Sequence, residues 1–432
     1  MNANILDFGA ISDGVTLNTA AIQRAIDECS VSGGGRVLVP AGVYKCGSIW
    51  LRSGVELHIE MGAELLASDN LDDYNELDAY GQNGSSEVEG WVGKHLIIAH
   101  EIENVAITGL GIINGNCHAF VTEDRDYPQY RNAYLWADGV SRLRDAERCR
   151  PGQLICFIEC ANVRVFDVTI KDSPCWSCYF LGCAYVSVRG IKVKNPKWMY
   201  NSDGIDIDAS RYVTVSDCII ETGDDAIAIR ACEKKLRKRD IHCECVTVTN
   251  CILSTSICAF RLGVGTGVIR HVRVSNIIIN RACNAVQFCT AYSEAGCANI
   301  EGVSFSGISC DNTERLIEAF AKNGAYIRDV VLENIRSTSS MQNYIDATDG
   351  EIDGFVMRNV KLDMLDKYEN MTSELLALRG ERSLFINGAK NVELCNIKIV
   401  GELKSSCGVA LATHCENLRA YECSFDMEVK NI

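Results

Sequence analysis

A short β-rich phrase recurs along the chain and constrains the fold more than any other feature of the sequence. Between residues 162 and 352 it returns every 23 to 33 residues. Most copies alternate apolar and polar residues, which is the period of a β-strand with one buried face. The clear copies are 162–166 (NVRVF), 185–189 (YVSVR), 212–216 (YVTVS), 245–249 (CVTVT) and 271–275 (HVRVS), with an earlier copy at 104–108 and looser ones at 300–303, 327–330, 352–355 and 391–394.

Several copies continue through a polar pair into a second short strand, as in 215–220 (VSDCII). A bent pair of strands per repeat, at a period in the twenties, favours a solenoid of stacked coils over a β-sandwich. With only five prolines and no Pro/Ser-rich stretch, no linker is indicated. We therefore predict an all-β fold, a single-domain right-handed parallel β-helix over residues 1–432.

Asparagines and cysteines recur at matching positions, for example Cys160 and Cys183 before their strands and Cys218 within one. Stacking would place such residues about 4.8 Å apart on successive coils. We expect internal ladders of small side chains here, because free cysteine behaves mostly as a buried hydrophobe. Segment 175–178 has CxxC spacing but lacks the second pair that zinc needs. No metal and no cofactor is expected.

Three segments depart from the repeat. Residues 19–29 carry apolar side chains at 22, 25, 26 and 29, the stripe of an amphipathic helix. With Thr19 as N-cap and the glycines at 33–35 as a stop, we predict that a helix within 18–30 caps the first coil. Segments 68–95 and 114–150 are polar, and insertions in solenoids collect on the binding face. We expect them to form the walls of a cleft.

Charge and cysteine content restrict partners and compartment. The formal net charge of −15 argues against nucleic acid or an anionic membrane as a partner. No run reaches the roughly 18 apolar residues that span a bilayer, and residues 1–5 do not begin a signal peptide. The 23 cysteines are then expected to be reduced thiols. We predict a cytoplasmic protein.

The densest set of charged residues within the repeats lies at 201–225. Asp224 follows Asp203 by 21 residues, about one coil, so the pair Asp224–Asp225 should stack beside Asp203. Crowded carboxylates raise at least one pKa, and an acid beside bases suits glycosidic hydrolysis by inversion. A calcium site, or aspartates that cap coil corners, would show the same spacing.

On these residues the chain resembles glycoside hydrolase family 28, the polygalacturonase-like β-helix enzymes, over essentially its whole length. The opening at 7–10 (DFGA), 33–35 (GGG) and 39–42 (VPAG) is similar to that of the bacterial members. More specific are 201–204 (NSDG) and 223–225 (GDD), which resemble the family's Asn-Thr-Asp-Gly and paired-aspartate blocks.

The resemblance implies a role for each residue of these blocks and a carbohydrate substrate. It implies that Asp224 is the general acid, and that Asp203 and Asp225 hold and deprotonate the attacking water. It further implies Asp206 as a support behind the carboxylates and Asn201 as a positioning group.

Two blocks of the family are absent. Residues 257–259 (ICA) stand in place of Gly-His-Gly, and 287–289 (QFC) in place of Arg-Ile-Lys. In the family that Arg and Lys grip the galacturonate carboxylate, so we expect little activity on polygalacturonate. Gln287, with Cys258 nearby, is instead expected to bind the hydroxyls of a neutral or deoxy sugar.

Three further residues are candidates for substrate contacts. Arg230 and Arg261 would each place a cation near the cleft, or else lie on the solvated outer wall. Trp176 would stack on a sugar ring, or else serve only in packing.

The sequence thus predicts an inverting glycoside hydrolase that is exo-acting on small oligosaccharides or glycosides. One alternative is a uronide-specific hydrolase with a relocated carboxylate-binding arginine. A second is a non-catalytic carbohydrate-binding or structural β-helix. A third is a polysaccharide lyase, which the loss of the cationic pair disfavours.

Overall fold

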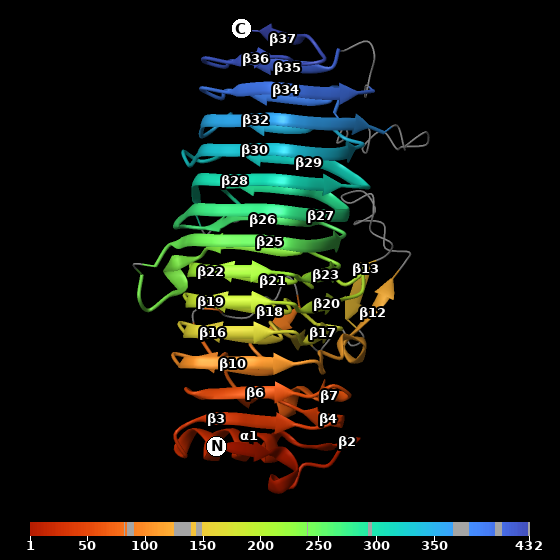
Figure 1. The fold of residues 1–432 in the computed structure, drawn as a ribbon, viewed down its shortest axis with the longest axis vertical. Helices are drawn as coiled ribbons and strands as arrows, with labels where there is room; N and C mark the ends of the chain where they lie inside the picture. The colour runs from red at the N-terminus through yellow and green to blue at the C-terminus, as the bar shows by residue number, and fades with distance from the viewer. Residues whose placement is uncertain are drawn as a thin grey trace. The chain divides into compact units, whose positions relative to one another are not determined.

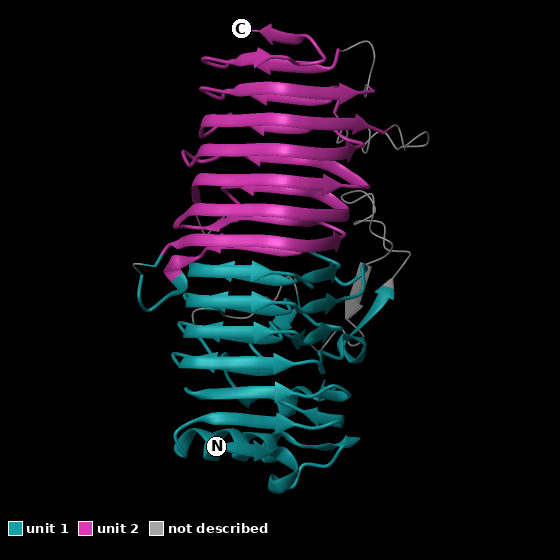
Figure 2. Ribbon diagram, viewed as in Figure 1, with its two compact units in different colours: residues 1–127, 138–224, 235–241 teal, residues 128–137, 225–234, 242–432 magenta. Residues whose placement is uncertain are grey.

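The computed structural model describes residues 1–81, 83, 90–124, 140–143, 149–239, 241–292, 296–365, 380–401 and 408–430. The chain divides into two compact units, coloured separately in Figure 2. Unit 1 comprises 1–127, 138–224 and 235–241, and unit 2 comprises 128–137, 225–234 and 242–432. The prediction of a single domain over 1–432 stays a prediction.

Unit 1 is a stack of coils made of short parallel strands (Figure 1). Its strands are β1 Asn2–Asn4, β2 Asp13–Leu17, β3 Gly35–Val39, β4 Gly42–Cys46, β5 Ile49–Trp50, β6 Val55–Ile59, β7 Ala63–Ala67, β8 Trp91–Val92, β9 Ile97–His100, β10 Glu103–Gly109, β11 Ile112–Asn114, β12 Val121–Asp124, β13 Val140–Leu143, β14 Arg150–Pro151, β15 Ile155–Ile158, β16 Ala161–Phe166, β17 Thr169–Lys171, β18 Cys178–Leu181, β19 Ala184–Arg189, β20 Lys192–Lys194, β21 Ile205–Asp208, β22 Arg211–Ser216 and β23 Ile219–Thr222.

Unit 2 is a second stack, with longer strands. They are β24 Ile227–Ala231, β25 Cys243–Thr255, β26 Cys258–Gly265, β27 Val268–Cys289, β28 Asn299–Cys310, β29 Thr313–Phe320, β30 Tyr326–Ser339, β31 Asn343–Asp346, β32 Glu351–Met364, β33 Leu384–Asn387, β34 Glu393–Val400, β35 Ala410–Thr413, β36 Arg419–Tyr421 and β37 Met427–Lys430. The one-turn helices of the chain are η1 Ile5–Phe8, η2 Leu71–Asp73, η3 Cys117–Ala119 and η4 Glu233–Lys235. The fold is the right-handed parallel β-helix that the repeat predicts.

The alternation of each phrase explains the core. In β16 the side chains of Val163 and Val165 point inward and are fully buried, while Arg164 between them faces out. Register pairing places Val186 of β19 beside Val163, and Val213 of β22 beside Val186. Columns of valine therefore run from coil to coil and form the interior.

The first residue of each phrase lies near the start of a strand but has a positive φ. Asn104, Asn162, Tyr185 and Tyr212 all have φ between 55° and 57°, a left-handed conformation that asparagine tolerates best among non-glycine residues. The side chains stack outside the coil, as where Asn162 Nδ2 donates to Asn104 Oδ1 at 3.2 Å. The prediction of internal asparagine ladders is therefore wrong.

The predicted cysteine ladders are confirmed as buried. Cys160, Cys183 and Cys218 are each no more than 2% exposed, and their thiols donate to backbone carbonyls two residues earlier. All the cysteines within the described part of the chain are free. Cys160, Cys183 and Cys218 thus pack inside the coil as small hydrophobic groups.

The predicted capping helix is α1, Thr19–Val31, which lies against the first strands of unit 1 (Figure 1). Its buried side chains include Ile22, Ala25, Ile26 and Cys29, the predicted stripe. The N-cap position is one residue earlier than predicted. Asn18 occupies it, and the Thr19 hydroxyl instead accepts the Gly47 N–H at 2.8 Å. Among the described residues no helix has the length and hydropathy of a membrane span.

Both predicted insertions leave the coil and meet each other. Trp91 of β8, from segment 68–95, pairs with Arg150 of β14, at the end of segment 114–150. Strands β12 and β13 form a separate antiparallel pair, and residues 125–139 and 144–148 lie outside the described residues. The role of the insertions as cleft walls stays a prediction.

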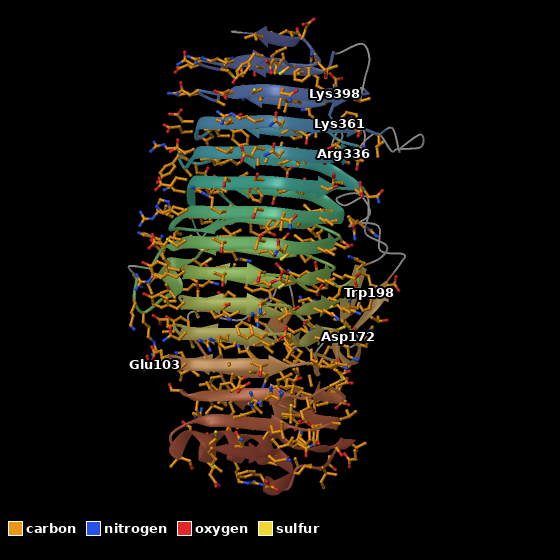
Figure 3. The ribbon with its side chains drawn as sticks, viewed as in Figure 1. Glu103, Asp172, Trp198, Arg336, Lys361 and Lys398 are labelled. Atoms are coloured by element: carbon orange, nitrogen blue, oxygen red, sulfur yellow. The ribbon has the colours of Figure 1, made fainter. Side chains whose placement is uncertain are left out.

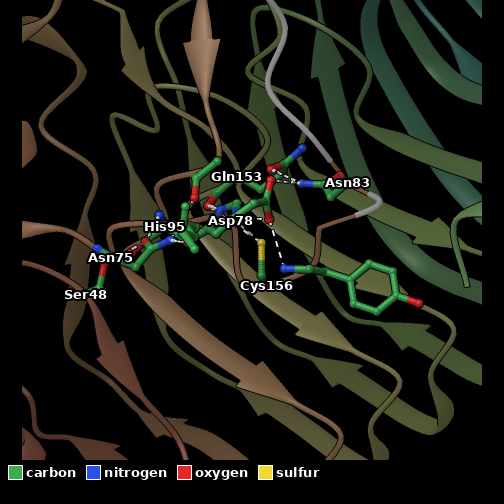
Figure 4. Close-up of polar contacts among 10 residues, drawn as sticks. Ser48, Asn75, Asp78, Asn83, His95, Gln153 and Cys156 are labelled. Atoms are coloured by element: carbon green, nitrogen blue, oxygen red, sulfur yellow. Dashed lines mark hydrogen bonds and ion pairs between the residues drawn. The ribbon is translucent and has the colours of Figure 1, made fainter. Parts of the chain in front are cut away.

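A buried polar cluster ties segment 68–95 to the coils (Figure 4). His95 Nδ1 lies 2.9 Å from the carbonyl oxygen of Gln153, so this nitrogen carries a proton. His95 Nε2 lies 3.3 Å from Asp78 Oδ1. The backbone N–H of His95 donates to Asn75 Oδ1 at 3.0 Å. The imidazole thus joins Asp78 of the insertion to the loop that precedes β15.

Candidate active site

The loop between β20 and β21, which carries Asp203, is held by a buried asparagine. Asn195 accepts the N–H of Ser173 at 3.0 Å from the preceding coil. Its amide donates to Ser177 Oγ at 2.8 Å and to the carbonyl oxygen of Ser202 at 2.9 Å. Because the side chain spans three segments, the backbone next to Asp203 is fixed in place.

Asp224 follows β23 on the next coil and approaches Asp203. The two residues offer carboxylate oxygens within 4.8 Å of each other; Asp203 is 3% exposed and Asp224 is half-buried. The backbone N–H of Asn201 donates to Asp224 Oδ2 at 2.9 Å. Only glycine fits at Gly223, since a Cβ there would lie 2.1 Å from the carbonyl oxygen of Met199. The predicted one-coil offset does bring these carboxylates together.

Arg150 is the buried cation of this corner. Its Nη2 donates to Asn201 Oδ1 at 2.7 Å, and its Nη1 donates to the carbonyl oxygen of Pro174. The guanidinium lies over the ring of Tyr200, 4.3 Å from the ring centre. Arg150 thereby connects the end of the second insertion to the loop that touches Asp224. The contacts of Arg150 could not be predicted from the sequence, because its partners lie 24 to 51 residues further along the chain.

Asp206 and Trp176 lie in the interior of unit 1. Asp206 is fully buried in β21 and pairs in register with Tyr179 of β18. Trp176 is 8% exposed, with its ring 6.3 Å from that of Trp91 and 5.2 Å from that of Tyr179. This packing leaves little of the indole for a sugar, and the predicted stacking role stays a prediction.

In unit 2, Asp225 forms a buried ion pair with Arg261. Arg261 Nη2 donates to Asp225 Oδ1 at 3.1 Å and Nε donates to Oδ2, while the Cys258 N–H donates to Oδ1 at 3.2 Å. Burial alone would lower the pKa of Arg261, but the charge of Asp225 raises it well above the usual value. At 7% exposure Arg261 does not lie on the outer wall.

Arg261 belongs to a column of polar residues in register. Gln287 of β27 pairs with Arg261 of β26, and Glu318 of β29 pairs with Gln287. Arg261 Nη1 donates to Gln287 Oε1, and Gln287 Nε2 donates to Glu318 Oε2. Glu318 also accepts from Asn284 at 2.9 Å and lies 3.9 Å from Arg315 Nη1. The amide of Gln287 thus joins a guanidinium to a carboxylate, and the sequence had not pointed to Glu318.

Cys258 and Arg230 complete the predicted set. Cys258 is fully buried with its thiol 3.6 Å from Gln287 Oε1, and burial raises its pKa well above the usual value, so the thiol is neutral. Arg230 is half-buried in β24, two residues beyond Ala228, which pairs with Arg261.

Two groups of described side chains in unit 1 have donor atoms close enough for a metal ion. Asp203 and Asp224 would suit a hard cation such as calcium, although that ion takes six to eight oxygen ligands. Cys117, His118 and Asp172 form the second group, with their donor atoms within 4.8 Å of one another.

Comparison with models of known families identifies one family. The profile of glycosyl hydrolases family 28 matches residues 29–375. An exo-poly-alpha-D-galacturonosidase of Dickeya chrysanthemi is 32% identical over 255 residues, which are 53% of this chain and 42% of that protein. A probable polygalacturonase of Arabidopsis thaliana is 25% identical over 422 residues, 91% of this chain and 82% of that protein. The match therefore spans less than half of the first relative's length.

Solved structures show the same fold. The family 28 exopolygalacturonase of Yersinia enterocolitica aligns with a TM-score of 0.66 at 21% identity, covering 100% of this chain and 78% of that one. An exopolygalacturonase of Thermotoga maritima aligns with a TM-score of 0.65 at 23% identity, covering 84% and 87%. At these identities the likeness is one of fold.

Proposed function

Because the chain belongs to glycosyl hydrolases family 28, we propose that it is an inverting glycoside hydrolase, exo-acting on small oligosaccharides or glycosides. The observation that carries this proposal is the close approach of the Asp203 and Asp224 carboxylates, with Asp225 the next residue in the chain. Two carboxylates at this distance do not both ionise readily, so one retains the proton that a leaving group needs.

Asp224 is assigned as the acid. Its Oδ2 accepts the N–H of Asn201, so the proton to be donated sits on Oδ1 and passes to the glycosidic oxygen as the bond to the anomeric carbon breaks. Water attacks that carbon from the opposite face and loses its proton to a carboxylate. Asp225, whose carboxylate accepts hydrogen bonds from Arg261 and from the Cys258 N–H, is assigned to hold the water. Asp203 then takes the proton.

Stereochemistry is the decisive test of this mechanism. Inverting sites built from two carboxylates separate them by about 6.5–9.5 Å, and retaining sites by about 5–5.5 Å. Asp203 and Asp224 are closer than the first range. In a two-carboxylate inverting site the water occupies a wide gap between the acid and the base. Inversion here therefore requires that Asp203 and Asp225 together hold the water while Asp224 acts as the acid.

The substrate assignment follows from the column in unit 2. The guanidinium of Arg261 is already bound to Asp225 and Gln287, and Glu318 adds a negative charge beside Gln287. Leaving a sugar carboxylate in such a site without its own cation would cost roughly several kcal/mol. The hydroxyls of a neutral or deoxy sugar can instead bind amide and carboxylate groups.

Two further points belong to the proposal. Exo action is supported by the name of the Dickeya chrysanthemi relative and by the two insertions that meet at β8 and β14. A cytoplasmic location is supported by the free, mostly buried cysteines of the described residues.

The catalytic assignment is tested with Asp224→Asn and Asp203→Asn. Each should lower kcat by roughly a hundredfold or more, because proton transfer in the transition state is lost. The matched control is Asp217→Asn, the same change at an exposed turn of the same coil with φ of 59°. Proton NMR of the first product should show the inverted anomer. Retention, or near-normal turnover of Asp224→Asn, would refute the assignment.

The substrate assignment is tested by kcat/KM on oligogalacturonides against rhamnosyl, galactosyl and arabinosyl compounds in one buffer. A neutral glycoside should be preferred. The second candidate, a uronide-specific hydrolase, is favoured by the named activity of the Dickeya chrysanthemi relative. It predicts preference for galacturonides that is lost in Arg261→Ala or Arg230→Ala. Binding of sugars without turnover of any would support a non-catalytic β-helix.

A further inference from the structure

A mixed group of metal-binding side chains lies two coils before Asp224, on the same edge of the stack. Cys117 and His118 begin η3, and Asp172 follows β17. Register pairing runs from β11 to β17, then to β20 and to β23, the strand that precedes Asp224. Figure 3 shows Asp172 and Trp198 on one side of the coils.

Backbone hydrogen bonds hold the two segments together. The N–H of Gly115 donates to the carbonyl oxygen of Lys171 and that of Cys117 to the carbonyl oxygen of Asp172, both at 2.9 Å. A Cβ on Gly115 would lie 2.7 Å from the Asp172 carbonyl oxygen, so only glycine allows this approach. The relative positions of the side chains are therefore set before any ligand binds.

Each side chain is placed by its own surroundings. Cys117 is fully buried against Phe120, Val121 and Met199. The His118 ring meets the edge of Trp198, with ring centres 5.6 Å apart. His118 Nε2 lies 3.7 Å from Asp172 Oδ1, which is too long for a direct hydrogen bond.

These distances suit an ion held between the donor atoms. In a tetrahedral zinc site, bonds of about 2.0–2.3 Å place neighbouring donors roughly 3.3–3.6 Å apart. The imidazole–carboxylate separation of 3.7 Å is close to that value, and all three donors lie within 4.8 Å. Small rotations of side chains would complete the geometry.

We propose that Cys117, His118 and Asp172 form a binding site for a divalent, zinc-type metal ion with three protein ligands and one open position. A thiolate and an imidazole select zinc over calcium or magnesium, which prefer oxygen ligands. The site is open because the His118 side chain is 55% exposed and Asp172 is 26% exposed. Thiolate and carboxylate together balance the charge of the ion.

Cobalt(II) is the probe, since thiolate ligation gives it a charge-transfer absorption and tetrahedral ligation intensifies its visible bands. One equivalent of Co²⁺ per chain should bind and be displaced by Zn²⁺. Asp172→Asn and His118→Ala, both at solvent-reaching positions, should each weaken binding at least about tenfold. Cys117→Ser should remove the charge-transfer absorption. Matched controls are Asp167→Asn, at an exposed turn of the same coil, and Cys218→Ser, at a buried corner.

The same titration is run on Asp224→Asn, whose metal affinity should equal that of the unmodified protein. Because the titration measures metal binding, its result tests the metal site independently of the proposed glycosidase activity. No binding at one equivalent, or binding unchanged in both Asp172→Asn and His118→Ala, would overturn the proposal. Loss of binding in Asp224→Asn would also overturn it, because the ion would then lie at the acidic pair.

Discussion

Replacing Arg261 with methionine removes the guanidinium that pairs with Asp225 but keeps an apolar side chain of similar reach. Asp225 is 2% exposed and Arg261 is 7% exposed, so water cannot take the place of the lost partner. The variant retains a buried carboxylate that accepts a hydrogen bond from the N–H of Cys258.

The expected cost follows from this burial. Breaking a buried ion pair from one side typically destabilises a protein by about 3–5 kcal/mol. The lost hydrogen bond to Gln287 adds about 1 kcal/mol. Asp225→Asn in the same chain removes the buried charge that has lost its guanidinium, so the double variant should recover to within about 2 kcal/mol of the unmodified protein.

Urea unfolding measures these differences, because urea does not screen charges as guanidinium does. Arg270→Met is the control: its pair with Glu244 is 2.7 Å long with the Arg270 side chain 36% exposed, and should contribute no more than about 1 kcal/mol. A loss below about 1 kcal/mol for Arg261→Met would contradict the reasoning. So would a double variant as unstable as the sum of the single changes.

Four other outcomes are expected. Thiol titration of denatured protein, prepared without reductant and protected from air, should count close to all 23 cysteines as free; many disulfides would indicate an exported protein. Trp176→Ala should lower stability by roughly 3–5 kcal/mol with little change in KM, whereas a large rise in KM at unchanged stability would show a sugar contact. Asp78→Ala should speed proteolysis within 68–95, because His95 Nε2 loses the Asp78 carboxylate; an unchanged cleavage rate would show that this contact does not hold the insertion. Arg150→Lys should lower kcat by about ten- to a hundredfold through misplacement of Asn201, and normal turnover would exclude that positioning role.

The fold was predictable because one rule, alternation of apolar and polar residues, repeats in every coil. The period of the repeat also placed Asp203 and Asp224 side by side, since their 21-residue offset is about one coil. It did not predict the side on which the asparagines lie. Asn162 lies in β16 with a left-handed backbone conformation, and this local geometry, rather than residue size, places its side chain outside.

The contacts that the sequence did not predict share a different property. Glu318, which was missed, lies one coil beyond Gln287, and Asn201, the partner of Arg150, lies 51 residues further along the chain than Arg150. Which residues stack depends on the length of each coil, and insertions make those lengths irregular. The ion pair of Arg261 could likewise not be predicted from spacing alone. Successive side chains of a strand point alternately outward and inward, so the position of Arg261 in the sequence did not say which side it faces.

The unshifted register of strands β28, β30 and β32 in unit 2 has a consequence for how such a chain can change over evolutionary time. Ile300 of β28 pairs with Ile327 of β30, which pairs in turn with Ile352 of β32. A gene duplication or deletion that adds or removes one whole coil would leave every row of hydrogen bonds intact. Length would then vary in units of a coil, while point changes within a coil alter chemistry. Descendants of one ancestor could thus lengthen their binding surface without revising their catalytic residues.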